Sequence, residues 1–198
     1  MITSLTRDAA LSTVDRKKLF EELLKSTYRQ AYTLAFRLTG NPAEAEDLVQ
    51  DTFVRAYRFF HRYDDMLPFS NWLYRIMCNA HIDTVRRRGR LRTTSLEVHT
   101  SNGATTIEVP DADASPDRNL LDTTMDENVQ ACLVEMNPEF RTAVLLADVE
   151  GLAYDDIALS MGTSVGTVRS RIHRGRKQLR KLLESRQPQI YGGLAHEL

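Results

Sequence analysis

The stretch YDDIALSMGTSVGTVRSRIHRGRK (154–177) has the pattern of a helix-turn-helix, and it decides the fold of the C-terminal part of the chain. Ile157 and Met161 repeat at helical spacing, and Gly162 then supplies a residue that tolerates left-handed dihedrals. Ser164 is expected to cap the helix that follows. The pattern predicts two short helices packed across a tight turn.

The second of these helices is strongly basic. Seven of the thirteen residues from Arg169 to Lys181 are Arg or Lys, while Val168 and Ile172 face inward. A helix with one apolar face and one arginine-rich face suits phosphates and base edges, so DNA is the first partner to consider. The alternative is a solvated helix face whose cations favour the helix macrodipole.

Charge is sorted along the chain although the total is nearly balanced. The 198 residues carry a formal net charge of −1 and are 42% hydrophobic, which is enough for globular cores. Five arginines lie between positions 86 and 92, whereas residues 126–156 contain eight acids and one base, Arg141. Such segregation bears on binding more than the total does.

The remaining composition excludes several classes of protein. Cys78 and Cys132 are far apart in apolar helical patterns, which predicts reduced, partly buried thiols and neither a disulfide framework nor a metal pair. No apolar run approaches a membrane span, and residues 1–15 lack the pattern of a signal peptide. We expect a cytoplasmic protein without stable membrane insertion.

Two amphipathic helices open the chain. Apolar residues from Phe20 to Leu38 follow helical spacing until Gly40. Asn41 is expected to cap a second helix, with Pro42 in its first turn and Glu44 placed as in a capping box. The two helices should form a hairpin.

A third helix completes the first expected domain. After the loop at 61–68, Ser70 is placed to cap a helix that runs to Gly89. Residues 15–90 are therefore predicted to form an all-helical domain.

The pattern changes after this block. Residues 91–121 are rich in Ser, Thr, Asn, Gly, Pro and Asp, which predicts a flexible or partner-ordered linker with a conceivable short strand at 105–109. A second domain is expected over 122–186. Its helices should run over 122–136, over 138–150 with Asn137 as cap, and through the helix-turn-helix. The fold class is thus all-α, with two small domains and a linker.

The third helix carries a candidate surface for single-stranded nucleic acid. Arg75, Asn79 and Arg86 share its polar side, next to aromatic residues on which bases could stack. We therefore favour a nucleic-acid role for these three. Large aromatics in small domains are mostly buried, so Phe69 and Trp72 could equally be packing residues.

The outward face of the second helix is charged. Asp47 and Asp51 lie one turn apart, and Arg55 shares this face. Like charges at this spacing destabilise a lone helix by ~0.2–0.5 kcal/mol, which a basic protein partner would relieve. A charged helix face is also often only solvated.

The sequence contains no catalytic constellation. Its five histidines are dispersed without an HExxH pattern, and its glycines form no phosphate-binding loop. We expect no enzymatic activity, no metal and no cofactor.

With these residues in hand, the chain resembles the extracytoplasmic-function (ECF) group of bacterial RNA polymerase sigma factors, the minimal two-domain sigma-70 group. The resemblance spans nearly the whole chain. It is carried, in the family's order and spacing, by DLVQDTFVRAYRFF (47–60), NWLYRIMCNAHIDTVRRRGR (71–90) and YDDIALSMGTSVGTVRSRIHRGRKQLR (154–180).

The resemblance implies roles for three sets of residues. Docking on the clamp coiled coil of the polymerase largest subunit is implied for Asp47, Gln50, Asp51, Phe53, Arg55 and Arg58. Capture of the unwound minus-ten strand, partly by extruding a base into a pocket, is implied for Tyr63, Phe69, Asn71, Trp72, Arg75, Asn79, Asp83, Arg86 and Arg87. Reading of the minus-thirty-five element in the major groove is implied for Ser164, Thr167, Arg169, Ser170, Arg171, His173, Arg174, Arg176 and Lys177.

The resemblance also implies partners. They are core RNA polymerase (the clamp coiled coil and the flap of its large subunits), double- and single-stranded promoter DNA, and an anti-sigma factor. The linker would thread through the polymerase cleft toward the RNA exit path. Within the recognition helix we expect Arg171 to read a base and Arg176 to contact a phosphate.

Two other readings compete with a sigma factor. A stand-alone dimeric repressor would use the same helix-turn-helix, but it would leave the aromatic and arginine surface of the first domain unexplained. A nucleic-acid-modifying enzyme would need a metal-ligand or nucleophile–base set, which the sequence does not contain.

Overall fold

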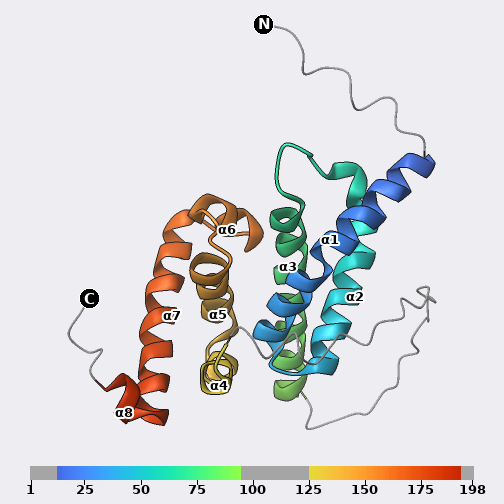
Figure 1. The fold of residues 1–198 in the computed structure, drawn as a ribbon. Coiled ribbons are helices and arrows are strands. Elements are labelled where there is room, and N and C mark those ends of the chain that lie inside the picture. The colour runs from blue at the N-terminus through green and yellow to red at the C-terminus, as the bar shows by residue number, and fades with distance from the viewer. Residues whose placement is uncertain (1–12, 95–124, 193–198) are drawn as a thin grey trace, which may run out of the picture.

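In the computed structural model, residues 13–94 and 125–192 are described, and they are helical wherever they are regular (Figure 1). We call residues 13–94 the N-terminal unit and residues 125–192 the C-terminal unit. Most of the linker expected at 91–121, and the conceivable strand at 105–109, lie outside the described residues. No helix in these two ranges is both long enough and apolar enough to cross a membrane.

The N-terminal unit begins with the expected hairpin. Helix α1 (Thr13–Thr39) is followed by α2 (Pro42–Phe59). Between them Gly40 adopts a φ of 72°, a left-handed conformation that favours glycine. The side chain of Asn41 accepts a hydrogen bond from the backbone N–H of Glu44, so the predicted cap is confirmed.

Helix α3 (Phe69–Thr94) differs from its predicted bounds at both ends. It follows the short turn η1 (Phe60–Arg62) and a loop. Ser70 lies inside the helix and does not cap it, because the N–H groups of Asn71 and Trp72 already bond to the carbonyl of Pro68. The helix also continues past Gly89. A single glycine costs only ~1 kcal/mol in a helix, too little to end a long one.

The C-terminal unit contains the predicted helix-turn-helix. Its helices are α4 (Glu127–Glu135), α5 (Pro138–Val144), the π-helical turn η3 (Leu145–Val149), α6 (Tyr154–Ser160), α7 (Val165–Arg186) and α8 (Pro188–Tyr191). Asn137 caps α5 and Ser164 caps α7, both as predicted. Gly162 has a φ of 58° in the turn. Helix α7 is longer than the short helix that the pattern predicts.

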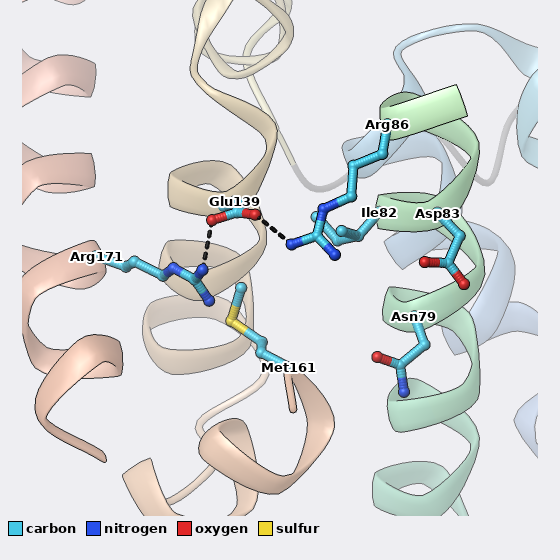
Figure 2. Close-up of a pocket in the computed structure, with 7 residues that line it drawn as sticks. All are labelled: Asn79, Ile82, Asp83, Arg86, Glu139, Met161 and Arg171. Atoms are coloured by element: carbon cyan, nitrogen blue, oxygen red, sulfur yellow. Dashed lines mark hydrogen bonds and ion pairs between the residues drawn. The ribbon is translucent and has the colours of Figure 1, made fainter. Parts of the chain in front are cut away.

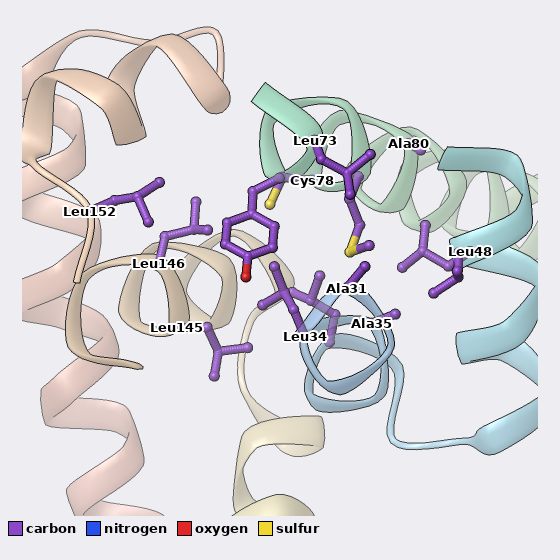
Figure 3. Close-up of a cluster of buried hydrophobic side chains, with 14 of the residues drawn as sticks. Ala31, Leu34, Ala35, Leu48, Leu73, Cys78, Ala80, Leu145, Leu146 and Leu152 are labelled. Atoms are coloured by element: carbon purple, nitrogen blue, oxygen red, sulfur yellow. The ribbon is translucent and has the colours of Figure 1, made fainter. Parts of the chain in front are cut away.

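The two units pack against each other through a continuous set of buried side chains (Figure 3). Leu34 of α1 and Leu73 of α3 belong to the same cluster as Leu145 and Leu146 of η3. Contacts between the units join α3 to α5 and α6, and α1 to α4 and α5. The packing brings surfaces far apart in the sequence into one cleft.

Candidate nucleic-acid and polymerase interfaces

The exposed side of α7 carries a stripe of polar and basic side chains. We call it the outer stripe; it consists of Arg169, Ser170, His173, Arg174 and Lys177, all of them exposed. Val168, Ile172 and Gly175 lie on the opposite, buried side. At the start of the helix, the Ser164 hydroxyl accepts a hydrogen bond from the N–H of Thr167 at 3.2 Å. Ser164 thus caps the first turn of α7.

Arg171 and Arg176 lie elsewhere on α7 than we expected. Each points along a flank of the helix toward a carboxylate of the same unit, Arg171 to Glu139 and Arg176 to Asp148. Arg176 binds Asp148 through two hydrogen bonds of 2.9 and 2.5 Å, and these bonds are the main cause of its raised pKa. Helical periodicity places both residues next to the buried side, so neither belongs to the outer stripe.

Six rings form an aromatic cluster between α1, the end of α2 and the start of α3. They are Phe20, Tyr57, Phe60, Tyr63, Phe69 and Trp72, with ring centroids 5.0–6.4 Å apart in the contacting pairs. Phe60 and Phe69 are buried, whereas Tyr63 and Trp72 are half-buried. Phe69 is therefore a packing residue in this structure. Tyr63 and Trp72 are the rings on which a base could stack.

The loop beside this cluster exposes two apolar residues that the sequence interpretation missed. Met66 is 85% exposed and Leu67 is 55% exposed. The side chain of Asp64 accepts a hydrogen bond from the N–H of Met66 at 3.0 Å, and Tyr63 donates from its hydroxyl to the carbonyl of Leu67 at 2.8 Å. An Asp-capped turn thus presents both side chains to solvent. Their signal in the sequence is an apolar pair enclosed by Asp65 and Pro68.

The polar side of α3 faces the C-terminal unit. Arg75, Asn79, Asp83, Arg86 and Arg87 are all exposed, and Asn71 is half-buried. Three of them line a narrow cleft between the units, which we call the interface cleft (Figure 2). Its lining is Asn79, Ile82, Asp83, Arg86, Glu139, Met161 and Arg171.

Glu139, which no sequence pattern marked as functional, lies at the centre of this cleft. Its Oε1 accepts a hydrogen bond from Arg86 at 2.7 Å, and its Oε2 accepts one from Arg171. The hydrogen bond from Arg86 is the main cause of the lowered pKa of this carboxyl group. One carboxylate therefore bridges the third helix to the recognition-like helix.

The candidate docking face on α2 is exposed in large part. Asp47, Gln50 and Arg58 are exposed, and Asp51 and Arg55 pair with each other through a bond of 2.9 Å from Nε to Oδ1. Phe53, by contrast, is buried and stacks with Tyr28 at 6.1 Å between ring centroids. Phe53 thus anchors the helix, and the charged residues form its surface.

The buried thiols have no arrangement suited to chemistry. Cys78 and Cys132 are free, as predicted, and both are fully buried where partial burial was expected. Burial, with a smaller effect of Glu150, raises the pKa of Cys78 to about 12, so its thiol stays protonated. Within residues 13–94 and 125–192, no three His, Cys, Asp or Glu side chains gather to hold a metal ion.

Both units match known protein families. Residues 23–91 match sigma-70 region 2, and residues 126–179 match sigma-70 region 4. The chain is 43% identical over 164 residues to the ECF RNA polymerase sigma factor SigE of Mycolicibacterium smegmatis. The matched residues make up 83% of this chain and 61% of that protein. It is 33% identical to the ECF RNA polymerase sigma factor SigW of Bacillus subtilis, over 83% of this chain and 88% of that one.

Solved structures agree with the sequence comparison. The sigma factor RpoE of Bartonella quintana, solved with the anti-sigma factor NepR, matches with a TM-score of 0.62 and 28% identity over 84% of this chain and 98% of that one. CnrH, solved with the cytosolic domain of CnrY, matches with a TM-score of 0.54 and 25% identity over 85% and 90%. These findings do not favour the repressor. The chain belongs to the ECF sigma factors of RNA polymerase.

Proposed function

We propose that this chain binds core RNA polymerase, directs it to specific promoters and assists strand separation there. One observation carries the proposal: a single chain presents two nucleic-acid surfaces of different chemistry. The N-terminal unit combines half-buried rings with exposed arginines on α3, as a single strand requires. The C-terminal unit offers the outer stripe of α7, as a major groove requires.

The division of labour follows from the residues that each surface exposes. Tyr63 and Trp72 would stack bases of the unwound minus-ten strand, with Arg75 and Asn79 holding its backbone. Met66 and Leu67 lie at the rim of this surface, where apolar side chains could separate stacked bases. The outer stripe would read the minus-thirty-five element, with Arg174 at its centre.

Polymerase docking is assigned to the exposed part of α2. Asp47, Gln50 and Arg58 project from it, and the Asp51–Arg55 pair gives it a fixed charge pattern. We propose that α2 docks on the clamp coiled coil of the polymerase. The C-terminal unit docks on the flap. The domain division at 15–90 and 122–186 belongs to this proposal, with the first unit serving melting and the second upstream recognition.

Regulation by an anti-sigma factor is part of the proposal. RpoE of Bartonella quintana is solved with the anti-sigma factor NepR, and CnrH with the cytosolic domain of CnrY. A chain of this kind acts in the cytoplasm, without a cofactor and without enzymatic activity of its own.

Run-off transcription tests the proposal. Purified chain is added to core polymerase and a library of genomic fragments, and the transcripts are mapped. We expect initiation at a limited set of sites that share two upstream elements, and none with core polymerase alone. A chain that binds fragments tightly by itself but adds no start sites would instead be a repressor.

A further inference from the structure

The turn that ends α2 carries an exposed ring outside the aromatic cluster. Phe59, the last residue of α2, is 43% exposed. Its ring contacts none of the cluster rings, and its face is instead covered by Arg62, whose guanidinium carbon lies 5.3 Å from the ring centre. A single exposed apolar residue is ordinary. A ring that holds a cation on its open face has in addition the two groups that bind a nucleotide.

The segment around this pair is both basic and aromatic. Residues 52–63 contain three arginines and one histidine, no acid, and five Phe or Tyr side chains. A nucleic-acid strand suits such a segment, because every base has a face that stacks on a ring and every phosphate attracts a cation. The charge and the rings therefore favour the same kind of partner.

The Phe59–Arg62 pair continues the surface formed by Tyr63 and Trp72. Phe60, the neighbour of Phe59, contacts Tyr63 and Trp72 with ring centroids 5.7 and 6.4 Å apart. Figure 1 shows the turn at the end of α2 on the side of the N-terminal unit that faces away from the C-terminal unit. A strand that stacks on Tyr63 and Trp72 can therefore extend to this turn.

The same turn lies beside the docking face of α2 and not on it. Asp47, Asp51 and Arg58 share one side of the helix, and Phe59 points about 100° away from that side. A polymerase helix bound to the docking face therefore leaves the ring of Phe59 open.

A base binds this ring more strongly than the guanidinium group does. A cation–π contact at an exposed position is weaker than the stacking of a base on an aromatic side chain. Arg62, which is exposed, gains charge-assisted hydrogen bonds to a phosphate when it leaves the ring. Only three positions separate Phe59 from Arg62, so the guanidinium group stays within reach of the nucleotide whose base covers the ring.

We propose that Phe59 and Arg62 form a further contact for a single strand, in which a base stacks on Phe59 and Arg62 binds the adjoining phosphate. The contact adds one nucleotide to the strand held by Tyr63 and Trp72. This inference deepens the proposed function and rests on it for the presence of that strand.

Three variants and two matched controls test the contact. Phe59→Leu keeps an apolar side chain but removes the ring, Phe59→Trp keeps a ring, and Arg62→Ala removes the cation. Tyr57→Leu is the control for the ring, since Tyr57 is 55% exposed on the same helix but leans on Phe20 of α1 at 5.2 Å. Arg29→Ala is the control for the charge, because Arg29 is exposed on α1. Urea unfolding of each protein verifies that the variants fold.

The experiment measures affinity and stacking separately in the full chain. The probe is a fluorescein-labelled, single-stranded oligothymidine 15-mer with one 2-aminopurine at its centre. Anisotropy at a series of salt concentrations reports affinity, and quenching of 2-aminopurine at saturation reports stacking on a ring.

The variants should differ in which of these quantities they change. We expect F59L to weaken binding about tenfold and to lose part of the quenching, whereas F59W retains both. R62A should lower the slope of log affinity against log salt by about 0.7, the value for one phosphate contact on a single strand. Y57L and R29A should match the parent.

Three results would overturn the contact. In the first, F59L and F59W weaken binding equally, which leaves no role for a ring; in the second, R62A has the salt slope of R29A. In the third, F59L and R62A bind the oligonucleotide as the parent does but co-purify less with core polymerase, which would assign the pair to a protein partner.

Run-off transcription with core polymerase is carried out on the same proteins. A parent chain that supports no transcription contradicts the proposed function, whatever the oligonucleotide shows. A parent that supports transcription while F59L binds the oligonucleotide normally contradicts only the contact at Phe59.

Discussion

Arg37 on α1 and Glu150 at the end of η3 form an ion pair of 3.4 Å between Nη1 and Oε1, with side chains that are only 10% and 15% exposed. The pair joins the N-terminal unit to the C-terminal unit. Tyr74 of α3 also lies beside Glu150, and burial together with this carboxylate raises the pKa of its hydroxyl well above the usual range.

Removing Glu150 should therefore destabilise the chain. Loss of one partner of a buried pair costs about 3–5 kcal/mol where the other charge stays buried. Because separation of the units would hydrate Arg37, we expect Glu150→Ala to lower the free energy of unfolding by about 1–3 kcal/mol in urea. The double variant R37M/E150L should recover most of this loss. A double variant whose loss equals the sum of the losses in R37M and E150L alone would show that the pair is not coupled.

A charge exchange at the Asp51–Arg55 pair tests polymerase docking without changing the stability of the chain. The double variant D51R/R55D keeps an ion pair at the same spacing but reverses the charge pattern of α2, so its free energy of unfolding should change by less than about 0.5 kcal/mol. Co-purification with core polymerase should fall at least tenfold. The exposed pair Lys17–Glu21 on α1, exchanged in the same way, is the control. Undiminished co-purification of D51R/R55D would remove the docking assignment.

The α3 surface should act in strand separation more than in recruitment. We expect the triple variant R75A/N79A/R86A to bind promoter fragments with polymerase as the parent does but to give weak permanganate footprints in the bubble, because its contacts to the single strand are lost. Arg88→Ala serves as the control, since Arg88 lies on the same helix and pairs with Glu44 at 2.9 Å. Normal footprints in the triple variant would contradict the assignment.

The outer stripe of α7 should read bases, and its flanks should not. Arg174→Ala is expected to cost about 1–3 kcal/mol of binding and to relax preference at one base pair, as loss of a bidentate guanine contact does. Arg176→Ala breaks the pair with Asp148 and should lower the free energy of unfolding by up to about 1 kcal/mol. Its preference for each base pair should stay unchanged. Binding to a saturation-mutated upstream element at two salt concentrations distinguishes them. Relaxed base preference in R176A would show that Arg176 reads a base and would contradict its place on the flank of the helix.

Acid should destabilise the fold through His81. This side chain is 6% exposed, its Nε2 has no hydrogen-bond partner, and burial, with Arg141 nearby, lowers its pKa to about 4. The unfolded chain, with an ordinary pKa near 6.5, binds the proton first as pH falls. Stability is therefore fully present above about pH 6.5 and is lost between there and about pH 4, by about 3 kcal/mol in total.

Urea unfolding at a series of pH values checks this dependence. His81→Gln removes the titrating group and should flatten the curve over this interval, even if the variant is less stable throughout. The carboxyl of Glu44 and the guanidinium of Arg88 also face His81, so both should be kept unchanged. An equal slope in parent and H81Q would assign the acid sensitivity to other groups.

Local sequence signals predicted the ends of several helices. Asn41, Asn137 and Ser164 cap helices as their residue types and positions indicate, and Gly162 takes up the left-handed turn. These features depend on a few neighbouring residues. The outer stripe of α7 likewise follows from periodicity, once Val168 and Ile172 fix the inward side.

Features that depend on distant partners could not be predicted in this way. The periodicity left Arg171 free to face a groove, but Glu139 of another helix binds its side chain. Helix α3 passes Gly89 because a glycine does not determine a boundary by itself. The interface cleft forms only where the two units pack together, and residues 95–124 separate these units in the sequence. The helical pattern of each unit by itself does not predict how the two pack.

The polar contacts between the units also determine how the packing of the two units responds to temperature. Separation would hydrate Arg141, Arg37 and Gln130 together with apolar residues such as Val134 and Leu146. Exposure of polar surface lowers the heat capacity and exposure of apolar surface raises it, so the two changes oppose each other. The free energy of opening is therefore less strongly curved with temperature than exposure of the apolar residues alone would make it. Calorimetry would register opening as a broad slope in the baseline before the main peak.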